Sequence, residues 1–174
     1  YLFFRAGRDK IYINDYNSAL YILSDKKRES ELKEFGFPFQ YIILAIENNN
    51  TIYGLKHGLE GYEIVKHNIE DNNIIWRFSF SIPLNASYYP YLVYGALSKD
   101  GSFYFNGPEK YYALDSETGR LKWSYHHADN GMPSAPPVIG LDNIIYITSN
   151  SILRETIIAL NSKGSKLWEF PLAV

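Results

Sequence analysis

Hydrophobic and polar positions alternate in short runs along the chain, and the clearest run lies at 110–125. Tyr111 and Ala113 precede a polar turn, and Leu121, Trp123 and Tyr125 follow it, in each case at every second position. A period of two places such side chains on one face of a pleated strand. The pattern therefore predicts two antiparallel strands joined by a tight turn.

The turn between these strands has the residues that a tight connection requires. Asp115 and Thr118 carry short polar side chains that bond turn amides, and Gly119 adopts a positive φ at little steric cost. An altered copy of the whole stretch follows at 159–168. The stretch is therefore predicted to be one unit of a repeat.

Two anchors recur along the chain and define that repeat. The first is a polar turn followed by a hydrophobic residue and a tyrosine, and the second is a pair of aromatic residues separated by one position. Both return about every 40 to 50 residues, a period typical of repeat architectures. The tyrosines are Tyr12, Tyr53, Tyr104 and Tyr146, and the pairs are Phe35/Phe37, Trp76/Phe78, Trp123/Tyr125 and Trp168/Phe170.

Each of the last two repeats contains four short runs bounded by Gly, Asn, Asp or Pro, which predict strands. These strands fall near 92–97, 102–105, 110–114 and 121–125, and near 137–140, 144–148, 156–160 and 166–170. Four antiparallel strands in a repeat of this length are typical of a β-propeller blade. We therefore expect an all-β chain that forms a single domain over 1–174, with four four-stranded antiparallel blades at 1–39, 40–83, 84–133 and 134–174.

Composition narrows the possible functions. A net charge of −2 gives no electrostatic reason to expect nucleic acid, and the apolar runs are too short to span a membrane. The absence of cysteine excludes disulfides and thiolate metal sites. An aromatic content of 17%, with 16 tyrosines, favours β structure. Two Asn-x-Ser/Thr triplets, at Asn49 and Asn85, leave glycosylation open.

The run Ala113-x-Asp115-x-x-Thr118-Gly119-x-x-x-Trp123 resembles the tryptophan-docking motif of quinoprotein-type β-propellers, which are built from PQQ-like repeats. The resemblance extends over essentially the whole chain, although only the third repeat matches the motif in full. In the fourth repeat, asparagine replaces the aspartate and the threonine is lost.

The resemblance implies that the tryptophans of the motif, Trp76, Trp123 and Trp168, stack between adjacent blades. It also implies a ring of seven or eight blades. Because the sequence contains four repeats, we expect it to be part of a larger ring or an arc completed by oligomerisation.

The same family includes PQQ-dependent dehydrogenases, in which a quinone and Ca²⁺ lie among inward-facing polar residues. No convergent cluster of that kind is found in the sequence, and we expect no catalytic residue, metal or cofactor. His126, His127 and Asp129 form the most metal-like group. Neighbouring histidines after a strand point to opposite faces, so a polar loop is the preferred interpretation.

An aromatic patch is predicted at Tyr88, Tyr89, Tyr91 and Tyr94. Such a patch is suited to docking a partner or a sugar, and the alternative is that it fills a blade interface. The leading hypothesis is a non-catalytic binding or scaffolding propeller, exported from the cytoplasm. Its partner would be another protein, or further blades from the same chain or another copy.

Relatives by this resemblance include outer-membrane-assembly lipoproteins and the luminal stress-sensor domains of the endoplasmic reticulum. The alternative functions are a PQQ-dependent dehydrogenase fragment and a carbohydrate-binding propeller.

Overall fold

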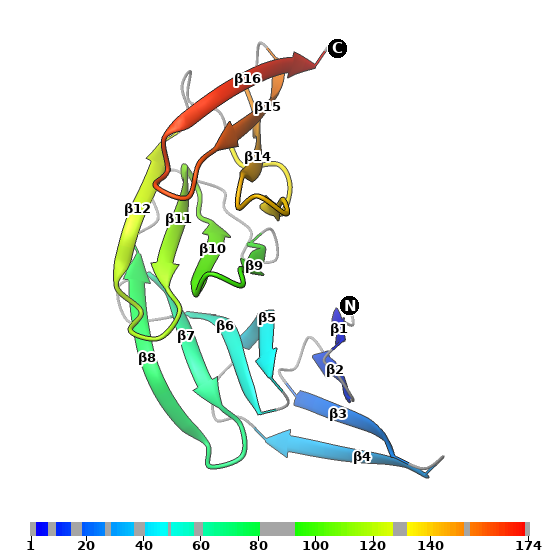
Figure 1. Cartoon of the computed structure of the whole chain (residues 1–174). Coiled ribbons are helices and arrows are strands. Elements are labelled where there is room, and N and C mark those ends of the chain that lie inside the picture. The colour runs from blue at the N-terminus through cyan, green and yellow to red at the C-terminus, as the bar shows by residue number, and fades with distance from the viewer. Residues whose placement is uncertain are drawn as a thin grey trace. The chain divides into compact units, whose positions relative to one another are not determined.

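The computed structural model describes residues 3–6, 10–14, 19–26, 29–36, 41–48, 50–57, 61–80, 93–126, 132–151 and 154–172. Side chains are described within these ranges from residue 42 onward, apart from residue 57. Every regular element in these ranges is a β-strand (Figure 1). The described part of the chain contains no helix that is long and apolar enough to cross a membrane.

The strands form four antiparallel four-stranded sheets, and consecutive strands are neighbours in each sheet. The first sheet contains β1 (Phe3–Ala6), β2 (Lys10–Asn14), β3 (Ala19–Lys26) and β4 (Glu29–Gly36). The second contains β5 (Tyr41–Asn48), β6 (Thr51–His57), β7 (Tyr62–Asn68) and β8 (Asn73–Phe80). The third contains β9 (Gly95–Leu97), β10 (Ser102–Asn106), β11 (Lys110–Asp115) and β12 (Leu121–His126). The fourth contains β13 (Val138–Ile139), β14 (Ile145–Asn150), β15 (Glu155–Leu160) and β16 (Lys166–Leu172). The prediction of an all-β chain with four such sheets is confirmed.

The sheets belong to two compact units, Tyr1–Ser81 and Ile82–Val174. In the first unit, the second sheet is buried on both faces. Ile52 and Tyr53 are adjacent in β6, and Ile64 and Val65 are adjacent in β7, yet all four are fully buried. Because adjacent strand residues point to opposite faces, both faces of this sheet are covered.

Two lysines are buried within the second sheet, and each has a carboxylate partner. The ammonium group of Lys66 lies 2.9 Å from the Glu47 carboxylate and 5.6 Å from the centroid of the Tyr53 ring. The ammonium group of Lys56 lies 2.8 Å from the Glu63 carboxylate. Such pairing offsets the desolvation that burial of a charge entails.

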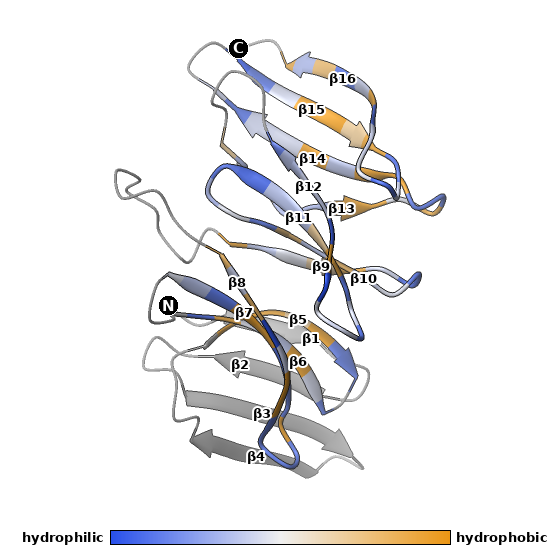
Figure 2. Cartoon of the chain, turned by 90° about the vertical axis from the view of Figure 1, so that its left-hand side faces the viewer, coloured by the Kyte–Doolittle hydropathy of each residue, from blue (hydrophilic) through white to orange (hydrophobic). Residues whose placement is uncertain are grey.

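In the second unit, the third and fourth sheets pack face to face around one apolar core (Figure 1). Trp123, Tyr125 and Ile139 pack against the edge of this core. Hydrophobic stretches occur within strands such as β13 and the middle of β15, whereas the connecting turns are mostly hydrophilic (Figure 2). The core residues are Tyr104, Tyr111, Ala113, Ile145, Ile147, Ile158 and Leu160.

The two outer hairpins of this unit contain the same irregularity. Ala113 pairs with Trp123 and Ala159 pairs with Trp168, and in both hairpins the register shifts directly after the alanine. A bulge of this kind bends the strand and re-aims the side chains beside it. Because the alanine side chain is small, the indole of the paired tryptophan has room beside it in each hairpin. Period-two reasoning did not predict the bulge.

The two innermost strands are shorter than the sequence predicts. β9 begins only at Gly95, because the amide of Tyr94 donates to the side chain of Asn106 (2.6 Å) instead of joining the ladder. β13 is limited to Val138–Ile139, because Pro137 has no amide hydrogen to donate. The amide of Gly140 closes the following turn by donating to Ile144 O (2.8 Å).

Candidate interaction site

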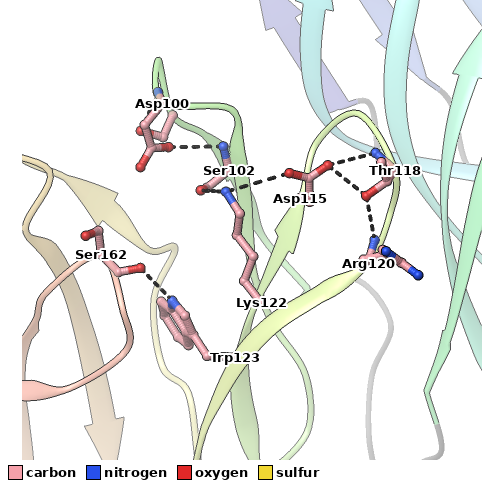
Figure 3. Close-up of polar contacts among 9 residues, drawn as sticks. Asp100, Ser102, Asp115, Thr118, Arg120, Lys122, Trp123 and Ser162 are labelled. Carbon is pink, nitrogen blue, oxygen red and sulfur yellow. Dashed lines mark hydrogen bonds and ion pairs between the residues drawn. The ribbon is translucent and has the colours of Figure 1, made fainter.

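The turn between β11 and β12 is held by a carboxylate (Figure 3). Asp115 Oδ1 accepts hydrogen bonds from the backbone amide (2.9 Å) and the hydroxyl (2.8 Å) of Thr118. These bonds favour the ionised carboxylate and hold the pKa of Asp115 below its ordinary value. Gly119 has a φ of 71°, and its amide donates to Asp115 O (2.9 Å). The turn is therefore built by the residues that the motif contains.

Lys122 links this turn to the start of β10 (Figure 3). Its ammonium group donates to Ser102 Oγ at 2.8 Å and lies 3.9 Å from Asp115 Oδ2. Because the Lys122 and Asp115 side chains are partly exposed, the pair adds little stability of its own. Its effect is to fix the approach of β12, and thereby the position of Trp123.

Trp123 connects the third sheet to the fourth. Its indole Nε1 donates to the backbone carbonyl of Ser162 at 2.9 Å (Figure 3). The ring lies against Gly164, where an added Cβ would come within 2.6 Å of Trp123 Cδ2. Gly164 also has a φ of 80°, so both its backbone and its surroundings require glycine.

The turn that receives Trp123 uses asparagine in place of aspartate. Asn161 Oδ1 accepts hydrogen bonds from the amides of Lys163 and Ser165, both at 3.0 Å. The amide of Gly164 donates to Asn161 O at 2.9 Å. The second backbone donor takes the place of the missing threonine hydroxyl, so the degenerate motif still forms an ordered turn.

Tyr111 makes a second polar link between the same two sheets. Its hydroxyl lies 2.8 Å from Ala135 O and 3.3 Å from Thr148 O, which are both carbonyl acceptors in the segment of the fourth sheet. The ring is buried, and burial raises the pKa of the Tyr111 hydroxyl. The interface is therefore fixed by one hydrogen-bonding aromatic residue on β11 and another on β12.

The opposite face of the fourth sheet carries a similar row of residues. Val138, Tyr146, Ala159 and Trp168 pair in that order across the four strands. The Tyr146 and Trp168 rings are 5.9 Å apart, as Tyr104 and Trp123 are 5.6 Å apart in the third sheet. Unlike Trp123, Trp168 is 45% exposed, and Phe170 and Val138 are each 59% exposed.

The other residues singled out from the sequence are placed as follows. Trp76 is buried in the second sheet, edge-on to Tyr53 with the ring centroids 5.7 Å apart. Tyr94 is half-buried, whereas Tyr88, Tyr89 and Tyr91 lie outside the described residues, as do Asn49 and Asn85.

The proposed histidine cluster is only partly described. His126 is exposed at the end of β12, and His127 and Asp129 lie outside the described residues. In the ranges given above, no three His, Cys, Asp or Glu residues are arranged to hold a metal ion.

Sequence reasoning missed the receiving half of the interface. The carbonyl groups of Ser162 and Ala135 are backbone atoms, so residue types do not reveal them. In the sequence, the glycine at position 164 is recognisable only as part of the altered copy of the turn at 159–168. The fourth repeat keeps a glycine at the position of Gly119 although the threonine is lost, and this is the signal in the sequence that indicates a role for Gly164.

No protein-family model matches the sequence, and no curated protein matches it. The fold is similar to that of a europium-containing methanol dehydrogenase (TM-score 0.56, 14% identity; 75% of this chain and 26% of that one). It is also similar to BamB from Moraxella catarrhalis (TM-score 0.56, 12% identity; 93% and 58%). A third similar structure is the quinohemoprotein alcohol dehydrogenase from Comamonas testosteroni (TM-score 0.53, 15% identity; 71% and 20%).

The chain spans less than two thirds of the length of each of these proteins. At such low identity, the likeness concerns the fold rather than the activity. The likeness in fold, together with the repeated hairpin and its tryptophan, shows which kind of sheet this chain contains. The four sheets are β-propeller blades, and the chain has the fold of the quinoprotein-type, PQQ-like repeat proteins.

Proposed function

We propose that this chain is a non-catalytic binding or scaffolding module that engages a protein partner outside the cytoplasm. The observation that carries the proposal is the outer face of the fourth sheet, where Trp168, Phe170 and Val138 are all about half exposed or more. Exposed apolar side chains of this kind on one sheet face mark interaction sites. Trp168, on the edge strand β16, is of the residue type most enriched among binding hot spots.

The chemistry of this face favours an apolar partner surface. Its first row is Val138, Tyr146, Ala159 and Trp168, and its second row is Thr148, Ile157 and Phe170. Neither row contains a charged residue. Burial of these side chains is therefore the main gain on binding, because no ion must be desolvated.

The proposal is tested with a photo-crosslinking amino acid placed at position 168 or 170 in the cell that produces the protein. We expect a discrete adduct with a protein partner at both positions. Position 141 is the control, because Leu141 lies in the turn between β13 and β14 and is fully exposed outside the two rows. Adducts that are equal at 141 and 168, or absent from 168 and 170, would contradict the proposal.

A second candidate is a fragment of a quinone-dependent dehydrogenase, which the likeness to two dehydrogenases favours. Addition of PQQ and Ca²⁺ separates the two functions. The binding-module proposal expects neither a bound-quinone absorbance band nor alcohol-dependent dye reduction. Stoichiometric quinone binding with turnover would replace it.

A further inference from the structure

Beyond its two apolar rows, the outer face of the fourth sheet has a third row, and this row contains a carboxylate. Asn150, Glu155 and Leu172 pair in that order across β14, β15 and β16. Glu155 is separated from Ile157 and Ala159 by even numbers of positions in β15, so its side chain lies on the same face as theirs. The Glu155 carboxylate is the charged group of these three rows.

A neighbouring hydroxyl orients the Glu155 carboxylate on this face. Ser134 Oγ lies 3.2 Å from Glu155 Oε1 and 2.8 Å from Thr148 Oγ1, and Thr148 belongs to the second row. Because an ionised carboxylate only accepts hydrogen bonds, the Ser134 hydroxyl donates to Glu155. A neutral donor of this kind holds the carboxylate in place but does not compensate its charge.

The cations of the second unit lie elsewhere. Every lysine and arginine of this unit falls within the described ranges, and no ion pair there joins one of them to Glu155. Arg154 directly precedes Glu155, but its guanidinium lies 4.0 Å from the carboxylate of Glu169 on the opposite face. Lys166 also pairs with Glu169, at 2.6 Å. Glu155 is therefore a charge without an opposite charge beside it.

A partner that covers this face must compensate the Glu155 carboxylate. Removing an ion from water is costly unless an opposite charge or several hydrogen-bond donors replace the water. The burial of the apolar rows favours binding, but this gain is offset where Glu155 is covered without a partner group. A guanidinium or an ammonium group meets the need, because its donors fit the carboxylate and its aliphatic stem covers apolar neighbours.

We propose that the partner of the outer face is a protein segment that combines apolar side chains, for Trp168 and Phe170, with one lysine or arginine, for Glu155. This inference rests on the proposed function and names the chemistry of its partner. Glu155 lies one row from Phe170 and two rows from Trp168, and successive rows on one face are about 7 Å apart. In an extended segment, the basic residue is therefore expected about two to four residues from the apolar anchors.

The test selects peptides from a phage-displayed library of random linear sequences on the unmodified chain. Clones that also bind Trp168→Ala are removed, so that only binders of the outer face remain. Parallel selections use Glu155→Gln, which keeps an acceptor for Ser134, and Glu155→Lys, which reverses the charge. The matched control is Glu169→Gln, because Glu169 lies on the opposite face of the same sheet and is already paired with Lys166. Circular dichroism verifies that each variant is folded.

We expect Lys or Arg beside apolar residues in the peptides selected on the unmodified chain and on Glu169→Gln. This enrichment should be lost on Glu155→Gln and replaced by Asp or Glu on Glu155→Lys. A lack of peptides that depend on Trp168, or equal basic enrichment on the unmodified chain and Glu155→Gln, overturns the proposal. So does a concentration-dependent dimer of the unmodified chain that Trp168→Ala abolishes, because a second copy then occupies the face.

An enriched peptide, synthesised with a fluorophore, gives the affinity by fluorescence anisotropy. Glu155→Gln and a neutral analogue of the basic residue in the peptide (citrulline for arginine, norleucine for lysine) should each weaken binding by about tenfold or more. Together they should weaken it no further than either alone, since both remove the same pair. Additive losses would contradict the pairing.

The two proposals can fail separately. If basic peptides are selected but the crosslinking in cells fails, the proposed function is rejected and the preference of the face for a cation stands. If the crosslinking succeeds and the selected peptides show no basic preference, the proposed function stands and this inference is rejected.

Discussion

The indole of Trp123 and the backbone of Gly164 are in direct contact across two sheets, and no side chain fits between them. Gly164 also has a φ of 80°, where residues with a Cβ are strained. Gly164 is therefore required both by the positive φ of its own turn and by the indole of Trp123 in the neighbouring sheet.

Gly164→Ala is expected to destabilise the chain through both effects, by about 2 to 4 kcal/mol in total. Gly101→Ala is the matched control, because Gly101 has a φ of 77° but its nearest contact for a Cβ is Ser116 Oγ at 3.7 Å. The control therefore carries only the backbone term, about 1 to 2 kcal/mol. Urea unfolding of both variants measures the difference, and equal losses would show that the indole does not depend on the glycine.

Trp123→Phe and Trp168→Phe are expected to differ in their effect on stability. Trp123→Phe removes the hydrogen bond to Ser162 O and part of the packing, a loss of about 1 to 2 kcal/mol. Trp168→Phe changes an exposed side chain and stays within about 0.5 kcal/mol of the unmodified chain. Thermal unfolding of the two variants in parallel checks the ranking, and the reverse order would refute it.

Tyr111→Phe is expected to destabilise the second unit by about 1 to 3 kcal/mol, because the carbonyls of Ala135 and Thr148 lose a buried donor. Tyr146→Phe removes a hydroxyl from the half-buried outer row and is expected to be close to neutral. Denaturant midpoints of both variants are the measurement. A Tyr111→Phe variant as stable as Tyr146→Phe would mean that water replaces the lost donor.

Asp115 is expected to make stability depend on acid pH. Because its pKa is lowered in the folded chain, the stabilisation is present above the ordinary aspartate pKa and is lost as the pH falls through the folded value. Asp115→Asn removes the titration but keeps an acceptor for Thr118, as Asn161 does for its own turn. Unfolding at about pH 7 and about pH 3 should show a smaller decrease for the variant than for the unmodified chain. An identical decrease in both would assign the acid sensitivity to other carboxylates.

Much of the fold is readable from the sequence, because each strand alternates locally and each turn carries its own Asp, Asn or Gly. The hairpin from Ala113 to Trp123 contains all the residues that form its turn, so its strands and the hydrogen bonds of Asp115 can be predicted from residue types. The innermost strands are less predictable. The ends of these strands depend on which acceptor each backbone amide bonds, and the amide of Tyr94 bonds the side chain of Asn106 instead of a neighbouring strand.

The candidate site is less predictable than the fold, because it depends on contacts between repeats. Trp123 and Trp168 occupy the same motif position, yet one is docked and the other exposed. Nothing local to either residue distinguishes them, since exposure is set by what lies against the sheet. For the same reason, the period-two pattern does not show whether the row that begins at Val138 is exposed or covered by another sheet.

The hairpin bulge allows the tip of the turn to vary in length. Ten positions separate Ala113 from its partner Trp123, and nine separate Ala159 from Trp168, yet both pairs meet and both bulges follow the alanine. The difference of one residue is absorbed at the tip, and the tryptophan keeps its orientation. The exposed Glu117 side chain on the tip of the first turn is therefore a suitable place for attaching a fluorophore, whereas the tip of the second turn is occupied by Trp123.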